Sequence, residues 1–278
     1  MNTNVVIIRG GGDIGTGVAY RLCRSGFKVV ITEMEKPLVI RRKVAFAQAV
    51  YEGHTTVEGL TAIKVRERKE IGALLNDGYV PVIIDPACTL AREIKAAVVV
   101  DATLAKRSTG MSRDMAPLTI ALGPGWEAGK DVHAVIETNR GHNLGRVILK
   151  GCAEPNTGIP EAVLGYGEER VLRAPCDGSV RHVLAIGDTV RVGATVCYVR
   201  DAEVKAALNG VVRGLILDGI TVKKGLKIGD IDPRGKKEYC YTISDKARAI
   251  GGGVLEAILS LRDRNTLPTT HPGTNTND

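Results

Sequence analysis

Continuous apolar runs alternate with amphipathic stretches along the first part of the chain. Residues 5–8, 80–84 and 97–101 form such runs, which are typical of parallel strands buried on both faces. Residues 16–25 and 67–76 instead carry apolar side chains at helical spacing. This alternation predicts an α/β domain whose ligand crevice lies at the carboxyl ends of the strands.

A glycine-rich turn follows the first predicted strand and precedes the first predicted helix. Its sequence, GGGDIG over residues 10–15, matches the pattern in which the first glycine allows a tight turn, the second lets a pyrophosphate approach, and the third lets helix and strand pack closely. The helix N-terminus would then face the phosphate. The turn therefore predicts a Rossmann-like doubly wound parallel sheet with a nucleotide-type site.

Two acidic residues qualify this prediction. Glu33 follows the second predicted strand, where a carboxylate can accept hydrogen bonds from ribose hydroxyls. Asp13 lies inside the turn and would repel a pyrophosphate unless it points away or pairs with Arg9. A turn that serves the fold alone, without a ligand, is the alternative interpretation.

An internal repeat occupies the second half of the chain. APCDGSVR (residues 174–181) is matched by AALNGVVR (residues 206–213), and GDTV (residues 187–190) by GITV (residues 219–222). The glycine pairs 178 and 210, 187 and 219, and 193 and 225 are each 32 positions apart. A constant offset of this kind predicts a small β structure built from two similar halves.

These repeated motifs resemble a biotinyl/lipoyl-like barrel-sandwich module. The resemblance implies a carrier lysine at a hairpin tip, but Val199 stands at the corresponding position and Lys205 lies at the hairpin base. We therefore expect an unmodified module without covalent biotin or lipoyl. Four regions result: a Rossmann-like domain with glycine-rich loops (1–165), the β module (166–240), a C-terminal helix (241–264) and a disordered tail (265–278).

Composition restricts the partners. The 278 residues carry a formal net charge of +7, which suits an anionic ligand. The basic residues form only short runs, so we expect no nucleic-acid partner. No apolar run reaches the ~20 residues of a membrane span, and the N-terminus lacks a signal-peptide pattern, so we expect no membrane partner and a cytoplasmic protein. The six cysteines and five histidines show no metal-ligand spacing, so no metal site is predicted.

Polar loops after the predicted strands add candidate ligand contacts. Lys106 and Arg140 could bind an anion, Trp126 is the single tryptophan and could meet a heterocycle, and His142 could act as an acid or base. Loop residues that only satisfy backbone groups are the alternative, and the catalytic residues stay unassigned. The predicted cofactor-binding residues are Gly10, Gly11, Gly12, Asp13, Ile14, Gly15, Glu33, Lys106, Trp126, Arg140 and His142.

Several motifs together resemble the YqeB family of selenium-dependent molybdenum hydroxylase system proteins. They are RGGGDIGTG (9–17), RRKVAFAQAVY (41–51), VDATLAK (100–106), LGPGWEAG (122–129), VIETNRGH (135–142), KIGDIDPR (227–234) and IGGGVLE (250–256). The resemblance implies an accessory protein in the maturation of molybdenum hydroxylases, closer to a chaperone than to a classical dehydrogenase. Its implied partners are the apo-hydroxylase or other maturation proteins, and self-association is left open.

The implied ligand is the molybdenum cofactor, a phosphorylated pterin, or a nucleotide. Two alternatives remain at this point. The first is an NAD(P)-dependent oxidoreductase that uses the turn at residues 10–15. The second is a non-catalytic scaffold in which that turn is only structural.

Overall fold

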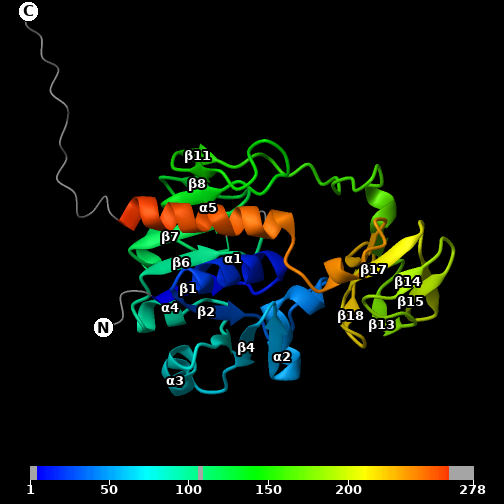
Figure 1. The fold of residues 1–278 in the computed structure, drawn as a ribbon, viewed down its shortest axis with the longest axis horizontal. Helices are drawn as coiled ribbons and strands as arrows, with labels where there is room; N and C mark the ends of the chain where they lie inside the picture. The colour runs from blue at the N-terminus through cyan, green and yellow to red at the C-terminus, as the bar shows by residue number, and fades with distance from the viewer. Residues whose placement is uncertain (1–4, 106–108, 263–278) are drawn as a thin grey trace, which may run out of the picture.

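The computed structural model describes residues 5–105 and 109–262 (Figure 1). The predicted disordered tail (265–278) lies outside them. A nine-stranded sheet runs in the order β10-β9-β7-β6-β1-β2-β5-β4-β3. Its strands are β1 (Val5–Arg9), β2 (Lys28–Glu33), β3 (His54–Val57), β4 (Leu60–Lys64), β5 (Val80–Ile84), β6 (Val98–Asp101), β7 (Leu118–Leu122), β9 (Ala134–Ile136) and β10 (Val147–Ile148).

Two long helices, α1 (Asp13–Arg24) and α5 (Asp245–Arg262), lie side by side on one face of this sheet (Figure 1). Alternate side chains of β1 enter two separate cores, with Val6 and Ile8 on the helix side and Val5 and Ile7 on the other. Both faces of the sheet are therefore buried, as its apolar strands require. The shorter helices are α2 (Ala49–Glu52), α3 (Ile71–Asn76) and α4 (Leu90–Glu93), and the 3₁₀ turns are η1 (Arg42–Val44), η2 (Phe46–Gln48), η3 (Arg68–Glu70), η4 (Arg113–Met115), η5 (Glu168–Arg170) and η6 (Lys237–Cys240).

The prediction of a Rossmann-like doubly wound parallel sheet is wrong. The sheet is mixed, because β3 pairs antiparallel with β4 at one edge and β10 pairs antiparallel with β9 at the other. The connections from β6 to β7 and from β7 to β9 contain no α-helix in their described residues. The helix that covers this part of the sheet is α5, which comes from the far end of the chain.

The repeat region folds into two four-stranded antiparallel sheets of order β12-β19-β17-β14 and β16-β15-β13-β18. The two sheet orders are equivalent when each of the four strands β12 to β15 is exchanged with the strand four places later. The matched strands β13 (Gly178–His182) and β17 (Gly210–Leu215) begin 32 residues apart. The others are β12 (Val171–Arg173), β14 (Thr189–Val190), β15 (Thr195–Val199), β16 (Ala202–Lys205), β18 (Thr221–Val222) and β19 (Lys227–Asp232).

The prediction of a biotinyl/lipoyl-like barrel-sandwich module is also wrong. The region forms this pair of antiparallel half-barrel sheets instead. Repeated glycine turns predict that strands recur, but they do not determine how the strands of the two halves combine into sheets. Here each sheet takes strands from both halves of the repeat. A further two-stranded sheet joins β8 (Glu127–Ala128) to β11 (Gly151–Cys152).

Candidate functional site

A two-lobed cleft lies where β1 and β2 end and β19 passes beside them. The first lobe, about 740 Å³, is lined by many ionisable side chains, including Arg140 and Lys246, and we call it the charged lobe. The second, about 640 Å³, contains Met34 and Leu38, and we call it the apolar lobe. The lobes meet at shared lining residues, which are Asp13, Ile14, Arg41, Leu104, Lys227 and Asp230.

Three glycines of the predicted turn are required by packing or backbone conformation. Gly10 has a φ of +94°, a Cβ on Gly11 would lie 2.9 Å from the Ala47 nitrogen, and a Cβ on Gly15 would lie 2.1 Å from the Gly10 oxygen. Neither Gly11 nor Gly15 lines the cleft, whereas Gly10 borders the apolar lobe. These glycines therefore hold β1, α1 and the segment at Ala47 close together.

Gly12 differs from the other three. Its φ is −60°, no heavy atom lies within 4 Å of a Cβ built on it, and it lines the apolar lobe. It is also the N-cap of α1 and makes no side-chain cap. Neither backbone strain nor packing therefore requires a glycine at position 12. The space beside Gly12 opens into the cleft, next to the first N–H groups of α1, which have no acceptor within the helix.

Asp13 pairs with Arg41, a residue that no sequence pattern had indicated as part of the site. Arg41 Nη1 lies 3.3 Å from Asp13 Oδ2, and Arg41 Nη2 donates to the carbonyl oxygens of Tyr239 and Thr242 at 2.9 and 3.2 Å. The expected partner Arg9 instead donates to the Pro86 oxygen at 2.6 Å from Nη2. The carboxylate inside the turn is thus already neutralised by a buried guanidinium.

Six basic and four acidic side chains line the charged lobe. The arginines and Lys227 are paired with carboxylates. Lys246 is the exception, because no carboxylate lies within ion-pair distance of its amine among the residues that the structure describes. The ten residues are Arg41, Arg140, Arg170, Arg213, Lys227, Lys246, Asp13, Glu154, Glu161 and Asp230.

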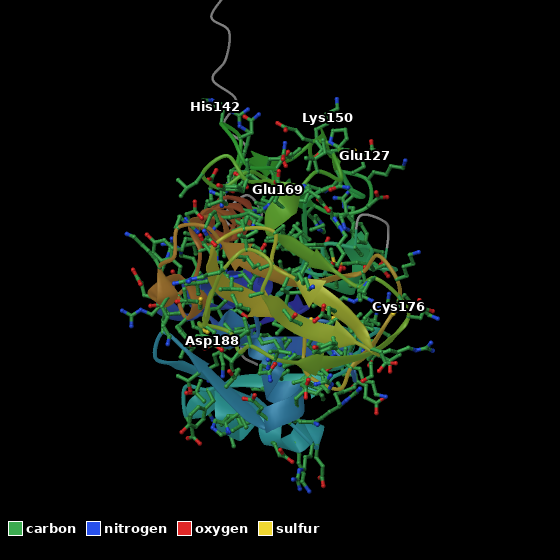
Figure 2. All side chains as sticks on the ribbon, turned by 90° about the vertical axis from the view of Figure 1, so that its right-hand side faces the viewer. Glu127, His142, Lys150, Glu169, Cys176 and Asp188 are labelled. Carbon is green, nitrogen blue, oxygen red and sulfur yellow. The ribbon has the colours of Figure 1, made fainter. Side chains whose placement is uncertain are left out.

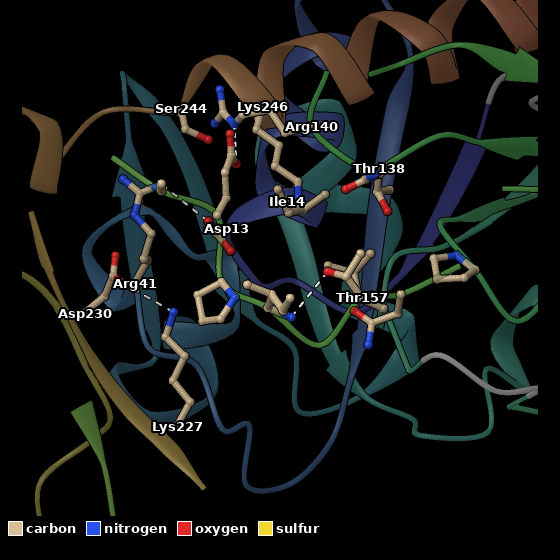
Figure 3. A pocket seen from close by; sticks show the side chains of 18 of the residues that line it. Asp13, Ile14, Arg41, Thr138, Arg140, Thr157, Lys227, Asp230, Ser244 and Lys246 are labelled. Atoms are coloured by element: carbon tan, nitrogen blue, oxygen red, sulfur yellow. Dashed lines mark hydrogen bonds and ion pairs between the residues drawn. The ribbon is translucent and has the colours of Figure 1, made fainter. Parts of the chain in front are cut away.

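Lys246 is the second residue of α5 and lies on the wall of the charged lobe together with Asp13 and Ile14 (Figure 3). Burial lowers the pKa of its amine, and the charges of Glu161 and Asp13 only partly oppose this effect. A half-buried ammonium without a counter-ion favours an anion as its partner. Sequence reasoning missed Lys246 because it lies more than 200 residues from the glycine turn.

Glu33 lies in the apolar lobe and is 8% exposed. One carboxylate oxygen accepts from the Gly11 nitrogen and the other from the Met34 nitrogen, both at 2.7 Å. Burial raises the pKa of this carboxyl, and the two backbone hydrogen bonds partly offset the shift. Each ionised oxygen has two lone-pair positions, so Glu33 keeps acceptor capacity after ordering the turn.

The predicted loop residues do not gather at one place. Arg140 lines the charged lobe but is paired with Glu161 and Asp245. Trp126 is 3% exposed and packs in the core on the opposite side of the sheet from α1. His142 is exposed at the surface and does not line either lobe (Figure 2). Lys106 lies outside the described residues.

The groups that line the cleft indicate which class of ligand it can bind. No group of three or more His, Cys, Asp or Glu side chains is arranged to hold a metal ion in residues 5–105 and 109–262. Within the same residues, no helix has both the length and the apolar character that a membrane span needs. The cleft combines an open helix N-terminus, a neutralised carboxylate and an unpaired amine, which together favour an anionic ligand.

Several solved structures show a weak likeness to this chain, with low TM-scores and low sequence identity. The ectoine utilization protein EutE from Ruegeria pomeroyi is 13% identical, over 73% of this chain and 57% of that one, with a TM-score of 0.23. An aspartoacylase family protein from Mesorhizobium loti is 11% identical, over 82% and 84% of the two chains, with a TM-score of 0.26. A succinylglutamate desuccinylase from Silicibacter gives 13% identity, coverage of 82% and 84%, and a TM-score of 0.25.

No family model matches the chain. A curated protein does match it: the uncharacterized protein YqeB of Escherichia coli is 55% identical over 257 residues, or 92% of this chain. The chain spans about half of that relative, 48% of its length. At this identity the chain is a homologue of that part of YqeB, which supports the YqeB family that its motifs indicated.

Proposed function

We propose that the cleft binds a phosphorylated ligand, either a molybdopterin-type cofactor or a nucleotide. In this proposal the chain is an accessory protein in the maturation of selenium-dependent molybdenum hydroxylases and docks on the apo-enzyme. The observation that carries the ligand class is Lys246, a half-buried amine without a carboxylate partner in the described structure, on the wall of the lobe that Asp13 and Ile14 of α1 also line.

Three features support a phosphate at this place. The N-terminus of α1 presents unpaired N–H groups and a partial positive charge. Gly12 leaves open space beside them. The Asp13 carboxylate, which would otherwise repel a phosphate, is held by Arg41. A phosphate between the α1 terminus and Lys246 would give the amine its missing counter-charge.

Binding of inorganic pyrophosphate tests the ligand class directly. Isothermal titration should show saturable binding to the wild-type chain, weakened about tenfold or more in Lys246→Met, because one charge-assisted hydrogen bond is lost. Lys150→Met is the matched control, since Lys150 is exposed, lies outside the cleft and carries the same charge (Figure 2). Equal binding by both variants would contradict the site.

The maturation role rests on the family motifs and needs its own test. A strain that lacks this chain should lose the activity of a selenium-dependent molybdenum hydroxylase but keep the hydroxylase polypeptide. The wild-type chain should restore that activity, and Lys246→Met should restore less. Normal hydroxylase activity in the deletion strain would contradict the role, whatever the cleft binds.

An NAD(P)-dependent oxidoreductase is the second candidate, and Glu33 favours it. A carboxylate at the last position of the second strand, lining the same cavity as Gly10 and Gly12, suits the hydroxyls of a ribose. Titration with NADH and NADPH, followed by nicotinamide fluorescence, tests this candidate. A saturable change is required for the oxidoreductase, although the first candidate also allows nucleotide binding, and no change at millimolar cofactor would exclude the oxidoreductase.

A further inference from the structure

Large apolar side chains stand exposed on the wall of the apolar lobe. Met34 is 56% exposed and Leu38 is 51% exposed, and both line the lobe beside the buried Pro37. They belong to the segment that follows β2. An apolar wall within a concave site favours an apolar or aromatic part of a ligand. This wall is independent of the charged groups that the proposed function uses.

A hydrogen-bond acceptor lies in the same lobe as the apolar wall. Glu33 uses one lone-pair position of each oxygen for a backbone N–H group and retains others. It can therefore accept from hydroxyl groups of a ligand part placed between the wall and the glycine turn. Neither an inorganic phosphate nor a purely aromatic ligand would use this acceptor.

The two lobes meet where the proposed phosphate would bind. Asp13 and Ile14, the first two residues of α1, line both lobes, whereas Met34 lines only the apolar one and Lys246 only the charged one. A ligand with its phosphate at this junction can extend from it into the apolar lobe. The lobe of about 640 Å³ lies within the ordinary size range of small-molecule sites.

We infer that the ligand joins its phosphate, through a hydroxyl-bearing linker, to a flat ring that lies against Met34 and Leu38. This inference rests on the proposed function and deepens it, because it specifies where the ring and the linker of a nucleoside phosphate or pterin phosphate lie in the cleft. Inorganic pyrophosphate and simple sugar phosphates would then occupy only part of the cleft. Glu33 accepts from the linker, and the wall formed by Met34 and Leu38 covers one face of the ring.

Comparing ligands with and without a ring tests the inference. Adenosine, guanosine and cytidine diphosphates and a pterin monophosphate are titrated against inorganic pyrophosphate on the full chain. At least one ring-bearing ligand should bind about tenfold tighter or more than pyrophosphate, because the ring buries apolar surface. Preference for a nucleoside diphosphate or for the pterin monophosphate identifies which source supplies the ring.

The double variant Met34→Asn, Leu38→Asn should abolish this preference and leave pyrophosphate binding unchanged. Both side chains are exposed, so the substitutions leave the core intact. Val192→Asn, at an exposed apolar position outside the cleft, is the matched control and should change neither affinity. If ring-bearing ligands bind no tighter than pyrophosphate, the inference is wrong and the phosphate site stands. If no phosphate compound binds, both are wrong.

Discussion

Arg41 holds Asp13 across the mouth of the glycine turn, with 3.3 Å between Nη1 and Oδ2. Its other terminal nitrogen donates to the carbonyl oxygens of Tyr239 and Thr242, which lead from the antiparallel sheets into α5. One buried side chain thus connects the start of α1, the segment before α5 and the cleft. Because Arg41 neutralises Asp13 and connects the wall of the cleft to these segments, we expect it to affect both the stability of the fold and the proposed ligand binding.

Replacing Arg41 with methionine should lower the free energy of unfolding. The substitution removes the partner of Asp13 and leaves two carbonyl oxygens without their donor, which costs roughly 2–4 kcal/mol. Urea unfolding followed by circular dichroism measures the change. Arg66→Met is the matched control, because Arg66 is exposed and its side chain makes no ion pair within the described structure, and it should stay within about 0.5 kcal/mol of the wild type. A similar small change in Arg41→Met would show that the pair does not anchor these segments.

Binding of pyrophosphate should weaken on the alkaline side because of Lys246. Burial lowers the pKa of its amine from the ordinary value of 10.5. The amine carries charge only below that lowered pKa, so its contribution to the affinity should be present at lower pH and be lost as the pH rises through that pKa. Since a bound anion favours the charged amine, binding should also take up protons in this range.

Titration calorimetry in buffers of different ionisation enthalpy measures both effects. The affinity of Lys246→Met should be lower and should lose this alkaline decrease. If the variant keeps the wild-type pH profile, another group supplies the titration and the assignment of Lys246 fails.

Two adjacent glycines in α5 should respond oppositely to alanine. No heavy atom lies within 4 Å of a Cβ built on Gly252, so Gly252→Ala should stabilise the helix by about 0.5–1 kcal/mol. A Cβ on Gly253 would lie 2.1 Å from the Gly145 oxygen, so Gly253→Ala should destabilise the protein by roughly 2 kcal/mol or more. Thermal unfolding should therefore show a higher midpoint for the first variant and a lower one for the second. A similar midpoint for both would mean that α5 does not pack closely against Gly145.

Local sequence patterns predicted the parts of the site that are close in the chain. The apolar run at residues 5–8 and the turn after it predicted β1 and the start of α1, and Glu33 lies against the turn through the Gly11 nitrogen. Strand β3 was missed because edge residues such as His54 and Thr56 are exposed and lack an alternating apolar pattern. Sheet edges and strand directions also depend on partners that periodicity does not reveal.

The parts of the site that come from distant segments could not be predicted in this way. Lys246 reaches the cleft because α5 packs on α1, where a Cβ on Gly17 would lie 2.7 Å from the Ala247 side chain. Nothing near Gly17 in the sequence specifies this contact. Trp126 is the opposite example. Its glycine-bounded segment predicted a loop that contacts a ligand, but the indole ring is buried in the core. Tertiary packing therefore decides which of several chemically suitable residues border the cleft.

Thiol labelling should distinguish the cysteines by burial. Cys152 is exposed, whereas burial raises the pKa of Cys23 to about 12 and that of Cys197 to about 11. Because the thiolate is the reacting form, iodoacetamide at about pH 8 should modify Cys152 first and leave Cys23 and Cys197 protected. Peptide mass spectrometry at increasing times measures the order.

Labelling in urea is the control for intrinsic reactivity and should modify all six cysteines. Cys152→Ser should remove only the fast phase, because the other thiols are protected by the same fold in both proteins. Equal rates for Cys23 and Cys152 under native conditions would mean that the α1 side of the sheet opens readily. If Cys23 loses its protection at the same urea concentration at which the circular dichroism signal is lost, its protection depends on the cooperative fold.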